Sequence, residues 1–284
     1  MARPISPPPH FDDKSPWGTY RPGLLTGMAL ALAHIVPGVL KPLAVVLRRN
    51  VKYHRAQPLD LEIRGLKLRL LPRGNISEEK YYTSPRLFDP AEFSVLERAL
   101  KPGGVFIDIG ANAGIYSLHA HNCMNGRGRI LAVEPDSEMA RRLAFNLQTN
   151  NLRDIEVIPL ALSDREGFAD FFVNPNQRGT NTLETNSKAG PARQTQTVRV
   201  QVGTLLALLQ SKKIEKIDAL KIDVEGYEHA VFGHFFANAP ASLFPRVIIC
   251  EFSPDSASGT AKLLEAAGYR CSRKTNLNLI YECG

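Results

Sequence analysis

The chain contains few cysteines, and they are scattered. Its 284 residues include Cys123, Cys250, Cys271 and Cys283, and no two of them form a Cys-x-x-Cys pair. Close pairs of cysteines are typical of zinc sites, and dense cysteines in a short secreted chain are typical of a disulfide framework. The sequence argues against both and favours a reducing compartment, which we take to be the cytoplasm.

An uninterrupted apolar run long enough to cross a bilayer is also missing. A spanning helix needs about 20 consecutive apolar residues, whereas the stretch from Leu24 to Leu47 is broken by His34, by Pro37-Gly38 and by Lys41-Pro42. A secretory signal is disfavoured too, because the segment before this stretch is long and contains two aspartates, and no small-residue cleavage site follows.

Acidic residues are scarce in the first quarter of the chain. Residues 1–73 carry twelve Lys and Arg against four Asp and Glu, and residues 74–284 carry 23 against 24, which together make the formal charge of +7. The basic character therefore belongs to the N-terminal quarter. Because the larger part is nearly neutral and lacks a basic patch, nucleic acid is disfavoured as a partner.

These patterns divide the chain into three expected parts. Residues 1–22, rich in proline, are expected to be a flexible tail, residues 23–73 a basic and apolar extension, and residues 74–284 the main domain. For residues 24–55 three interpretations stay open. They are a spanning helix, short helices held on an anionic membrane by cations such as Arg48 and Arg49, or helices that pack over the mouth of a ligand site or in a subunit interface. No prediction about the oligomeric state follows.

The most informative segment is the run from Val105 to Gly114, Val-Phe-Ile-Asp-Ile-Gly-Ala-Asn-Ala-Gly. A short apolar run between Pro102-Gly103-Gly104 and a glycine turn is typical of a parallel strand that is covered on both faces. Gly110 and Gly114 allow the backbone to turn sharply and to approach a ligand above the strand end. Asp108, the only charge in the run, needs hydrogen bonds from turn amides or from that ligand. The segment indicates a nucleotide site.

The turn lacks the glycine spacing of a dinucleotide site. A Gly-x-Gly-x-x-Gly motif starting at Gly110 would need glycine where Asn112 and Ile115 stand, so close approach to a pyrophosphate is not provided for. The turn instead suits a ligand with an adenosine and an amino acid but no phosphate, which is S-adenosylmethionine. Glu134 closes the next apolar run, where it is placed to accept hydrogen bonds from both ribose hydroxyls.

Strand and helix patterns alternate along the rest of the chain. A β-hairpin is expected over residues 59–71 with Gly65 at its turn, and Asp89-Pro90-Ala91-Glu92 predicts a helix capped by Asp89 that runs to about residue 100. Further strands are expected at 105–109, 129–134, 155–162, 168–173, 197–202, 219–223, 246–251, 269–273 and 277–282, and helices at 115–123, 137–150, 205–210, 229–235 and 261–267. This alternation predicts right-handed crossovers and a parallel sheet.

Acidic residues recur at the ends of the expected strands. In an open parallel sheet, ligands bind outside the carboxyl ends of the strands, and these ends carry Asp108, Glu134, Asp164, Asp223, Glu225 and Glu251. Such a cluster suits a cationic cofactor, and S-adenosylmethionine carries a sulfonium and an ammonium group. We expect no metal; magnesium held by Asp223, Glu225 and Glu251 is the alternative.

Four segments of the chain carry a further pattern: residues 106–114, 133–135, 161–164 and 220–228, of which the Lys-Ile-Asp-Val-Glu-Gly part at 221–226 is the most specific. Together they resemble the FkbM family of S-adenosylmethionine-dependent methyltransferases. The resemblance covers residues 89–282, with only a loose match at 179–183. It implies a class I (Rossmann-like) methyltransferase fold, an α/β structure with a doubly wound, mostly parallel sheet behind an N-terminal helical and β extension. It also implies O-methylation of a hydroxyl on a sugar, lipid or natural product.

The expected cofactor contacts come from seven residues, Asp108, Gly110, Asn112, Gly114, Glu134, Asp164 and Asp223. Methyl transfer needs alignment of donor and acceptor, and a base contributes a factor of about 10² to 10⁴. We expect Glu225 to be that base, with Asp223 holding the cofactor or orienting the acceptor. His229 is a further candidate that otherwise faces solvent or packs in the domain, and for His119 and His121 surface or core roles are favoured.

The acceptor is expected to be a hydroxyl on a small molecule or glycan. Methyltransferases that act on base or amide nitrogens usually carry Asn or Asp followed by Pro-Pro and an aromatic residue after the fourth strand, where this chain has Asp223-Val224-Glu225-Gly226. Two other classes stay open, a module that binds S-adenosylmethionine without transferring methyl and a nicotinamide-dependent oxidoreductase. Fold alone does not decide between them.

Overall fold

The structure is a computed structural model of the chain and describes residues 8–35, 42, 46, 51–52, 55–183, 195–251 and 257–283. The first seven residues of the expected tail lie outside the described residues. Arg48 and Arg49 and most of the apolar stretch after Ile35 lie outside them as well.

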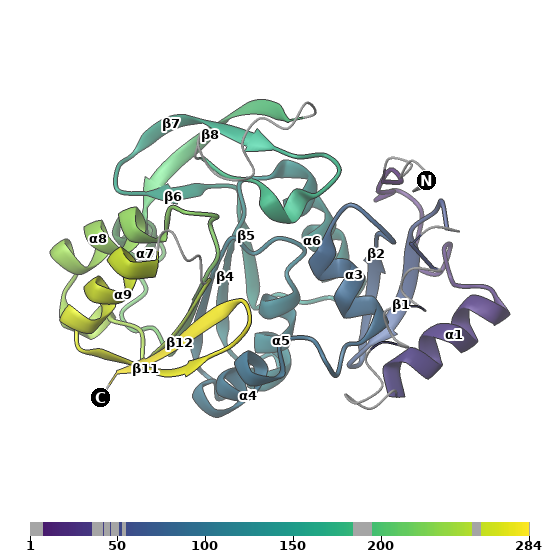
Figure 1. Cartoon of the computed structure of the whole chain (residues 1–284), viewed down its shortest axis with the longest axis horizontal. Helices are drawn as coiled ribbons and strands as arrows, with labels where there is room; N and C mark the ends of the chain where they lie inside the picture. The colour runs from purple at the N-terminus through teal and green to yellow at the C-terminus, as the bar shows by residue number, and fades with distance from the viewer. Residues whose placement is uncertain are drawn as a thin grey trace.

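The centre of the molecule is a seven-stranded sheet in the order β11-β12-β10-β9-β3-β4-β5 (Figure 1). Its parallel strands are β5 (Ile155–Ile158), β4 (Arg129–Val133), β3 (Val105–Ile109), β9 (Ala219–Ile222) and β10 (Val247–Glu251). β12 (Asn278–Cys283) pairs antiparallel with β10 and with β11 (Tyr269–Lys274). The expected α/β fold with a doubly wound, mostly parallel sheet is confirmed.

Helices cover both faces of this sheet (Figure 1). On one face lie α4 (Pro90–Ala99), α5 (Ile115–Met124) and α6 (Ser137–Thr149), and on the other lie α7 (Leu205–Ser211), α8 (Glu228–Asn238) and α9 (Ala257–Ala266). Successive side chains of a strand point to opposite faces, so Phe106 joins the first apolar cluster and Ile107 the second. This explains why the strands read as nearly continuous apolar runs.

A smaller sheet stands beside the end of β5 and has the order β6-β8-β7. Its strands are β6 (Ala161–Ser163), β8 (Gln196–Thr204) and β7 (Gly167–Val173). The expectation of one strand over residues 155–162 is wrong, because the chain leaves the central sheet after Ile158 and Ala161 pairs with Val202 of β8 instead.

The N-terminal extension is built on the expected hairpin, β1 (Leu59–Ile63) and β2 (Leu66–Leu70), which turns at Arg64-Gly65. Two helices accompany it, α1 (Leu24–Ile35) and α3 (Ile76–Thr83), the second of which we did not expect. The apolar side chains of the hairpin belong to the same cluster as those of α4, α5 and α6. Among the described residues, no helix has the length and apolar character that crossing a membrane requires.

Residues 8–22 are not the flexible tail that their prolines suggested. Phe11 is fully buried against Leu71 and Phe145. The backbone carbonyl of Asp12 accepts a hydrogen bond from Arg69, with 2.6 Å between Nη1 and O. This part of the chain is therefore packed onto the hairpin and α6.

Candidate active site

The site lies where the order of the strands reverses. The chain proceeds from β3 to β4 and β5 on one side, and from β9 to β10 on the other, so a crevice forms above the carboxyl ends of β3 and β9. Gly110 follows β3 with φ of 71°, and a Cβ there would lie 1.9 Å from the carbonyl oxygen of Asp223 after β9. Only glycine allows these two turns to approach so closely.

A first cavity opens on one side of this contact, above β3, β4 and the start of β6. Its wall is apolar near the strands and polar near the loops. It is lined by Ile109, Gly110, Asn112, Val133, Glu134, Pro135, Leu160, Ala161, Leu162, Phe171, Arg178, Gly179, Asn181, Leu183, Asp223, Val224 and Glu225.

Glu134 is held at the wall of the first cavity by two backbone amides. Its Oε2 accepts a hydrogen bond from Asn112 N at 2.7 Å and its Oε1 accepts one from Asp136 N at 2.8 Å. The residue is only 6% exposed, and burial raises the pKa of its carboxyl group to about 8. A carboxylate fixed in this way is suited to accept hydrogen bonds from a diol.

A second cavity adjoins the first and shares Asn112, Gly179 and Asp223 with it. It extends towards α3, α5 and the turn between β11 and β12. Its other lining residues are Ser77, Phe88, Asp89, Ala111, Ala113, Ile115, Tyr116, Lys221, Glu251, Leu277 and Asn278.

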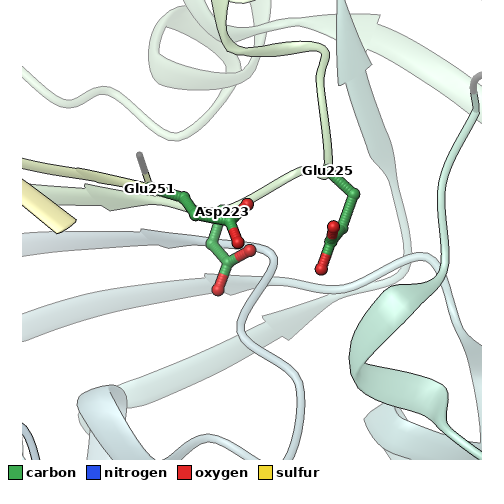
Figure 2. Close-up of side chains that lie close together, drawn as sticks. All are labelled: Asp223, Glu225 and Glu251. Carbon is green, nitrogen blue, oxygen red and sulfur yellow. The ribbon is translucent and has the colours of Figure 1, made fainter. Parts of the chain in front are cut away.

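Three carboxylates meet where the two cavities join. Each of Asp223, Glu225 and Glu251 places an oxygen within 4.8 Å of the others. Figure 2 shows Asp223 and Glu251 close together, and Glu225 to the right of this pair. Burial and the neighbouring charge of Asp223 raise the pKa of Glu225 to about 8 and that of Glu251 to about 10. Glu251 therefore keeps its proton at neutral pH, and the three groups do not repel one another as three full charges.

Lys221 supplies a positive charge beneath these acids. Its Nζ lies 3.1 Å from Asp223 Oδ2 and donates a hydrogen bond to the carbonyl oxygen of Gly110 at 3.2 Å. Burial disfavours the ammonium form, but the charges of Asp223 and Asp108 hold the pKa of Lys221 above its usual range. The three acids have the oxygen donors that magnesium prefers, whereas Lys221 already neutralises part of their charge.

Two of the expected cofactor residues support the glycine turn from behind. Asp108 is fully buried, lines neither cavity and accepts hydrogen bonds from the backbone amide and the hydroxyl of Ser117, at 3.1 and 2.7 Å. Gly114 has φ of 78°, and a Cβ there would lie 2.3 Å from Leu143 of α6. Asp108 and Gly114 face α5 and α6 and line neither cavity, and the direct cofactor contacts expected of them stay a prediction.

Two other expected site residues point away from the cavities. Asp164 is exposed after β6 and accepts a hydrogen bond from Ser163 Oγ. His229 is exposed on α8 beside Gly259 of α9, because Glu228 takes the inward position and accepts hydrogen bonds from the amides of Val224 and Gly226. Neither residue lines the first or the second cavity, so His229 is not placed to act as the base there.

Asp89 does not cap α4 with its side chain as expected, and it lines the second cavity instead. It adopts φ of 37° and its side chain makes no helix-capping hydrogen bond. Its Oδ2 instead accepts a hydrogen bond from the hydroxyl of Tyr116 at 2.8 Å. Both side chains line the second cavity, and the sequence held no signal that these two residues would meet.

Three more polar contacts around the first cavity were missed. Asn75 caps α3 and its side-chain amide donates to Asn112 Oδ1; the Asn-x-x-Glu pattern at residues 75–78 could have revealed this cap. Arg178 and Asn181 both donate to the carboxylate of Asp136, with shortest distances of 2.6 and 2.7 Å. These contacts fix residues 178–183 across the first cavity.

The first cavity has the features that S-adenosylmethionine requires. Glu134 can accept the ribose hydroxyls, the apolar wall can cover an adenine, and Asp223 and Glu225 place acidic side chains where a cation would lie. The turn that begins at Gly110 lacks the glycine pattern of a phosphate-binding loop, because Asn112 stands where that pattern has glycine. The residues present therefore fit this cofactor.

Comparison with known proteins agrees with this fit. Residues 108–271 match the model of the methyltransferase FkbM domain, and no curated protein matches the chain. Solved structures with similarity to the chain include an FkbM methyltransferase from Methylobacillus flagellatus KT, with 13% identity, 72% of this chain and 54% of that chain covered, and a TM-score of 0.41. A precorrin-6y C5,15-methyltransferase from Geobacter metallireducens GS-15 has 16% identity, with 67% of this chain and 86% of that chain covered and a TM-score of 0.41. An S-adenosylmethionine-dependent O-methyltransferase from Thermotoga maritima has 13% identity, with 68% and 65% covered and a TM-score of 0.40.

The family model spans more than half of the chain and contains both the glycine turn and the acidic cluster. This membership removes the nicotinamide-dependent oxidoreductase from the alternatives. The chain belongs to the FkbM family of S-adenosylmethionine-dependent methyltransferases, and S-adenosylmethionine is its cofactor.

Proposed function

We propose that this methyltransferase acts on a hydroxyl group of a sugar, lipid or natural-product acceptor. The observation that supports this most is the position of Asp223, which lines both cavities at the point where they join. A donor in the first cavity and an acceptor in the second would meet at this carboxylate. Catalysis of methyl transfer depends mainly on such alignment.

The residues of the first cavity hold and orient the donor in this proposal. The bound cofactor supplies a methyl group on a positively charged sulfur. Glu134 accepts the ribose hydroxyls, and Asp223 and Glu225 face the positive charge. Glu225 has φ of 52°, an unusual conformation for a residue other than glycine, and its carbonyl accepts a hydrogen bond from Thr182 Oγ1 at 3.0 Å. Such strain costs about 1–3 kcal/mol and is concentrated at functional sites.

The second cavity suits an acceptor that carries hydroxyl groups and an apolar face. Phe88 and Tyr116 offer aromatic surface, while Asp89 and Asn278 offer hydrogen-bond acceptors and donors. A neutral polar acceptor agrees with this lining better than a nucleic acid, for which a basic surface is needed.

We assign Asp223 as the base that accepts the proton of the reacting hydroxyl. We expected Glu225 to be the base, but Glu225 lines the first cavity and not the second. Asp223 lines both cavities, and its Oδ2 accepts a hydrogen bond from the ammonium group of Lys221 at 3.1 Å. A positioned base contributes a factor of about 10² to 10⁴ to the rate.

Calorimetry and methyl-transfer assays test the proposal together. We expect the purified chain to bind S-adenosylmethionine and S-adenosylhomocysteine but not NAD, with or without magnesium. Label from methyl-labelled cofactor should then pass to members of a panel of hydroxylated glycans, lipids and polyketides, and not to amine or amide controls. Cofactor binding without transfer to any hydroxyl compound, or transfer to an amine, contradicts the proposal, and the first of these outcomes favours the non-catalytic module.

Asp223→Asn separates binding from turnover. We expect this variant to retain a folded structure and to lose about 10² in kcat. Asp164→Asn is the matched control, because Asp164 is an exposed acid outside both cavities. Equal rates for the two variants would show that Asp223 is not the proton acceptor.

A further inference from the structure

Helix α1 is apolar on both of its faces. Its 12 residues include no Asp, Glu, Lys or Arg. Leu30 and Ala33 face the protein and are 2% and 1% exposed, whereas its outer face carries Leu24, Leu25, Met28 and Leu32, which are 80%, 82%, 62% and 49% exposed. A helix that is apolar all round is normally covered on all sides, so the outer face of α1 calls for a partner.

This outer face lies at the edge of the molecule. Figure 1 shows α1 beside the β1–β2 hairpin and α3, away from the central sheet. The ring of His34 lies 2.6 Å from the carbonyl oxygen of Tyr82, which fixes the C-terminal end of α1 to α3. The exposed leucines are therefore presented on a helix that is anchored to the body of the protein from its other side.

The stretch of sequence that contains α1 carries positive charge and no negative charge. Between Asp13 and Asp60 the sequence contains seven Lys and Arg and not one Asp or Glu. A described cavity at the end of α1 is lined by His34, Arg64, Arg86 and Glu62, so it holds two guanidinium groups and one carboxylate. Two copies of this surface would repel each other, whereas an anionic surface is attracted to it.

The length of α1 decides how it can meet a lipid bilayer. At 1.5 Å per residue, 12 residues extend about 18 Å, well short of the roughly 30 Å hydrocarbon core. We propose that α1 lies in the plane of an anionic membrane, with Leu24, Leu25, Met28 and Leu32 inserted among the lipids and the neighbouring cations at the phosphates. Apolar burial and attraction to anionic lipid act together in helices of this kind.

Vesicle co-sedimentation of the full chain tests this proposal without any acceptor, so the result does not depend on the proposed function. The probes are vesicles of phosphatidylcholine alone and vesicles in which about a third of the lipid is phosphatidylglycerol. We expect binding to the anionic vesicles, much weaker binding to the neutral ones, and release at about 1 M salt, where the Debye length falls to about 3 Å.

The double variant Leu25→Glu, Met28→Glu places two charges in the inserted face. We expect it to weaken binding to anionic vesicles about tenfold or more, while its melting temperature stays that of the wild type because both side chains are exposed. Phe168→Glu is the matched control, since Phe168 is an equally apolar residue that is 67% exposed on β7. It should bind as the wild type does.

Three outcomes would overturn the proposal. The first is that the wild type does not bind anionic vesicles. The second is that Phe168→Glu weakens binding as much as the double variant. The third is that analytical ultracentrifugation finds a dimer that the double variant dissociates, which would make α1 an interface between copies of this chain.

Discussion

Replacing Lys221 with methionine removes a buried positive charge and keeps a similar side-chain volume. Lys221 Nζ lies 3.1 Å from Asp223 Oδ2. Asp108 is fully buried, and among the described residues its Oδ1 has no hydrogen-bond partner. Without the ammonium group, both carboxylates lose their main opposite charge.

The size of the effect follows from the burial of the two acids. Removing one partner of a buried ion pair costs about 3–5 kcal/mol. Water screens part of the charge of Asp223, whose side chain is 36% exposed. We therefore expect the free energy of unfolding to fall by about 2 kcal/mol, which lowers Tm by roughly 4–8 °C for a chain of this size.

The pH dependence gives this prediction a second readout. Burial raises the pKa of Asp108 and the charge of Lys221 opposes this shift, so without Lys221 the folded-state pKa of Asp108 rises further above its unfolded value. The folded variant then binds more protons than the unfolded one, so its stability falls as pH rises. The loss in Tm relative to the wild type should be larger at about pH 8 than at about pH 5.

Thermal denaturation of Lys221→Met and of Lys216→Met measures both effects. Lys216 is the control because its side chain is 64% exposed, so water screens the ion pair that it forms with Asp218 at 3.5 Å. Lys216→Met should melt as the wild type does. If Lys221→Met also melts with the wild type at both pH values, the reasoning from the buried charge is refuted.

Three further predictions concern the cavities. Gly110→Ala should cost about 3 kcal/mol or more in unfolding free energy, because its Cβ would lie 1.9 Å from the carbonyl of Asp223. Gly103→Ala, with nothing within 4 Å, should cost only about 1 kcal/mol; equal melting curves would contradict the close contact. Burial raises the pKa of Glu134 to about 8, so affinity for S-adenosylmethionine should rise as pH increases from about 6 to 9. Calorimetry of Glu134→Gln should show a smaller rise, because only the ionisation of Glu225 then contributes in this pH range; a rise as large as that of the wild type would contradict the role of Glu134. Tyr116→Phe removes a 2.8 Å hydrogen bond in the second cavity and should raise the KM for the acceptor roughly tenfold with unchanged Kd for the cofactor; a weaker Kd would place Tyr116 in the donor site.

Local patterns were enough to predict the central sheet and its helices. The apolar runs that became β3, β4, β9 and β10 and the glycine turn after β3 are properties of short segments, and the reversal of strand order then placed Gly110 and Asp223 together. The path of the chain after Ile158 was not predictable in the same way. It depends on a pairing between Ala161 and Val202, which are far apart in the sequence.

The orientation of single side chains limited the prediction of the site. Asp108 and Ile109 are neighbours in β3, but they point to opposite faces of the sheet, so one is buried against α5 and the other lines the first cavity. At the start of α8, consecutive residues of the helix point in different directions, so Glu228 faces inward and His229 faces outward. The hydrogen bond between Tyr116 and Asp89 could not be predicted from the sequence, because only the packing of α4 against α5 brings these two residues together.

The contacts that hold residues 178–183 also bear on the rate of turnover. In the proposed function, spent cofactor must leave the first cavity before a new molecule can enter, and this segment forms part of the wall of that cavity. Arg178 and Asn181 are tied to Asp136, the residue that caps α6. Exchange of the cofactor is thereby linked to the opening of an ion pair and a hydrogen bond, a conformational step that can set kcat even when the chemical step is fast.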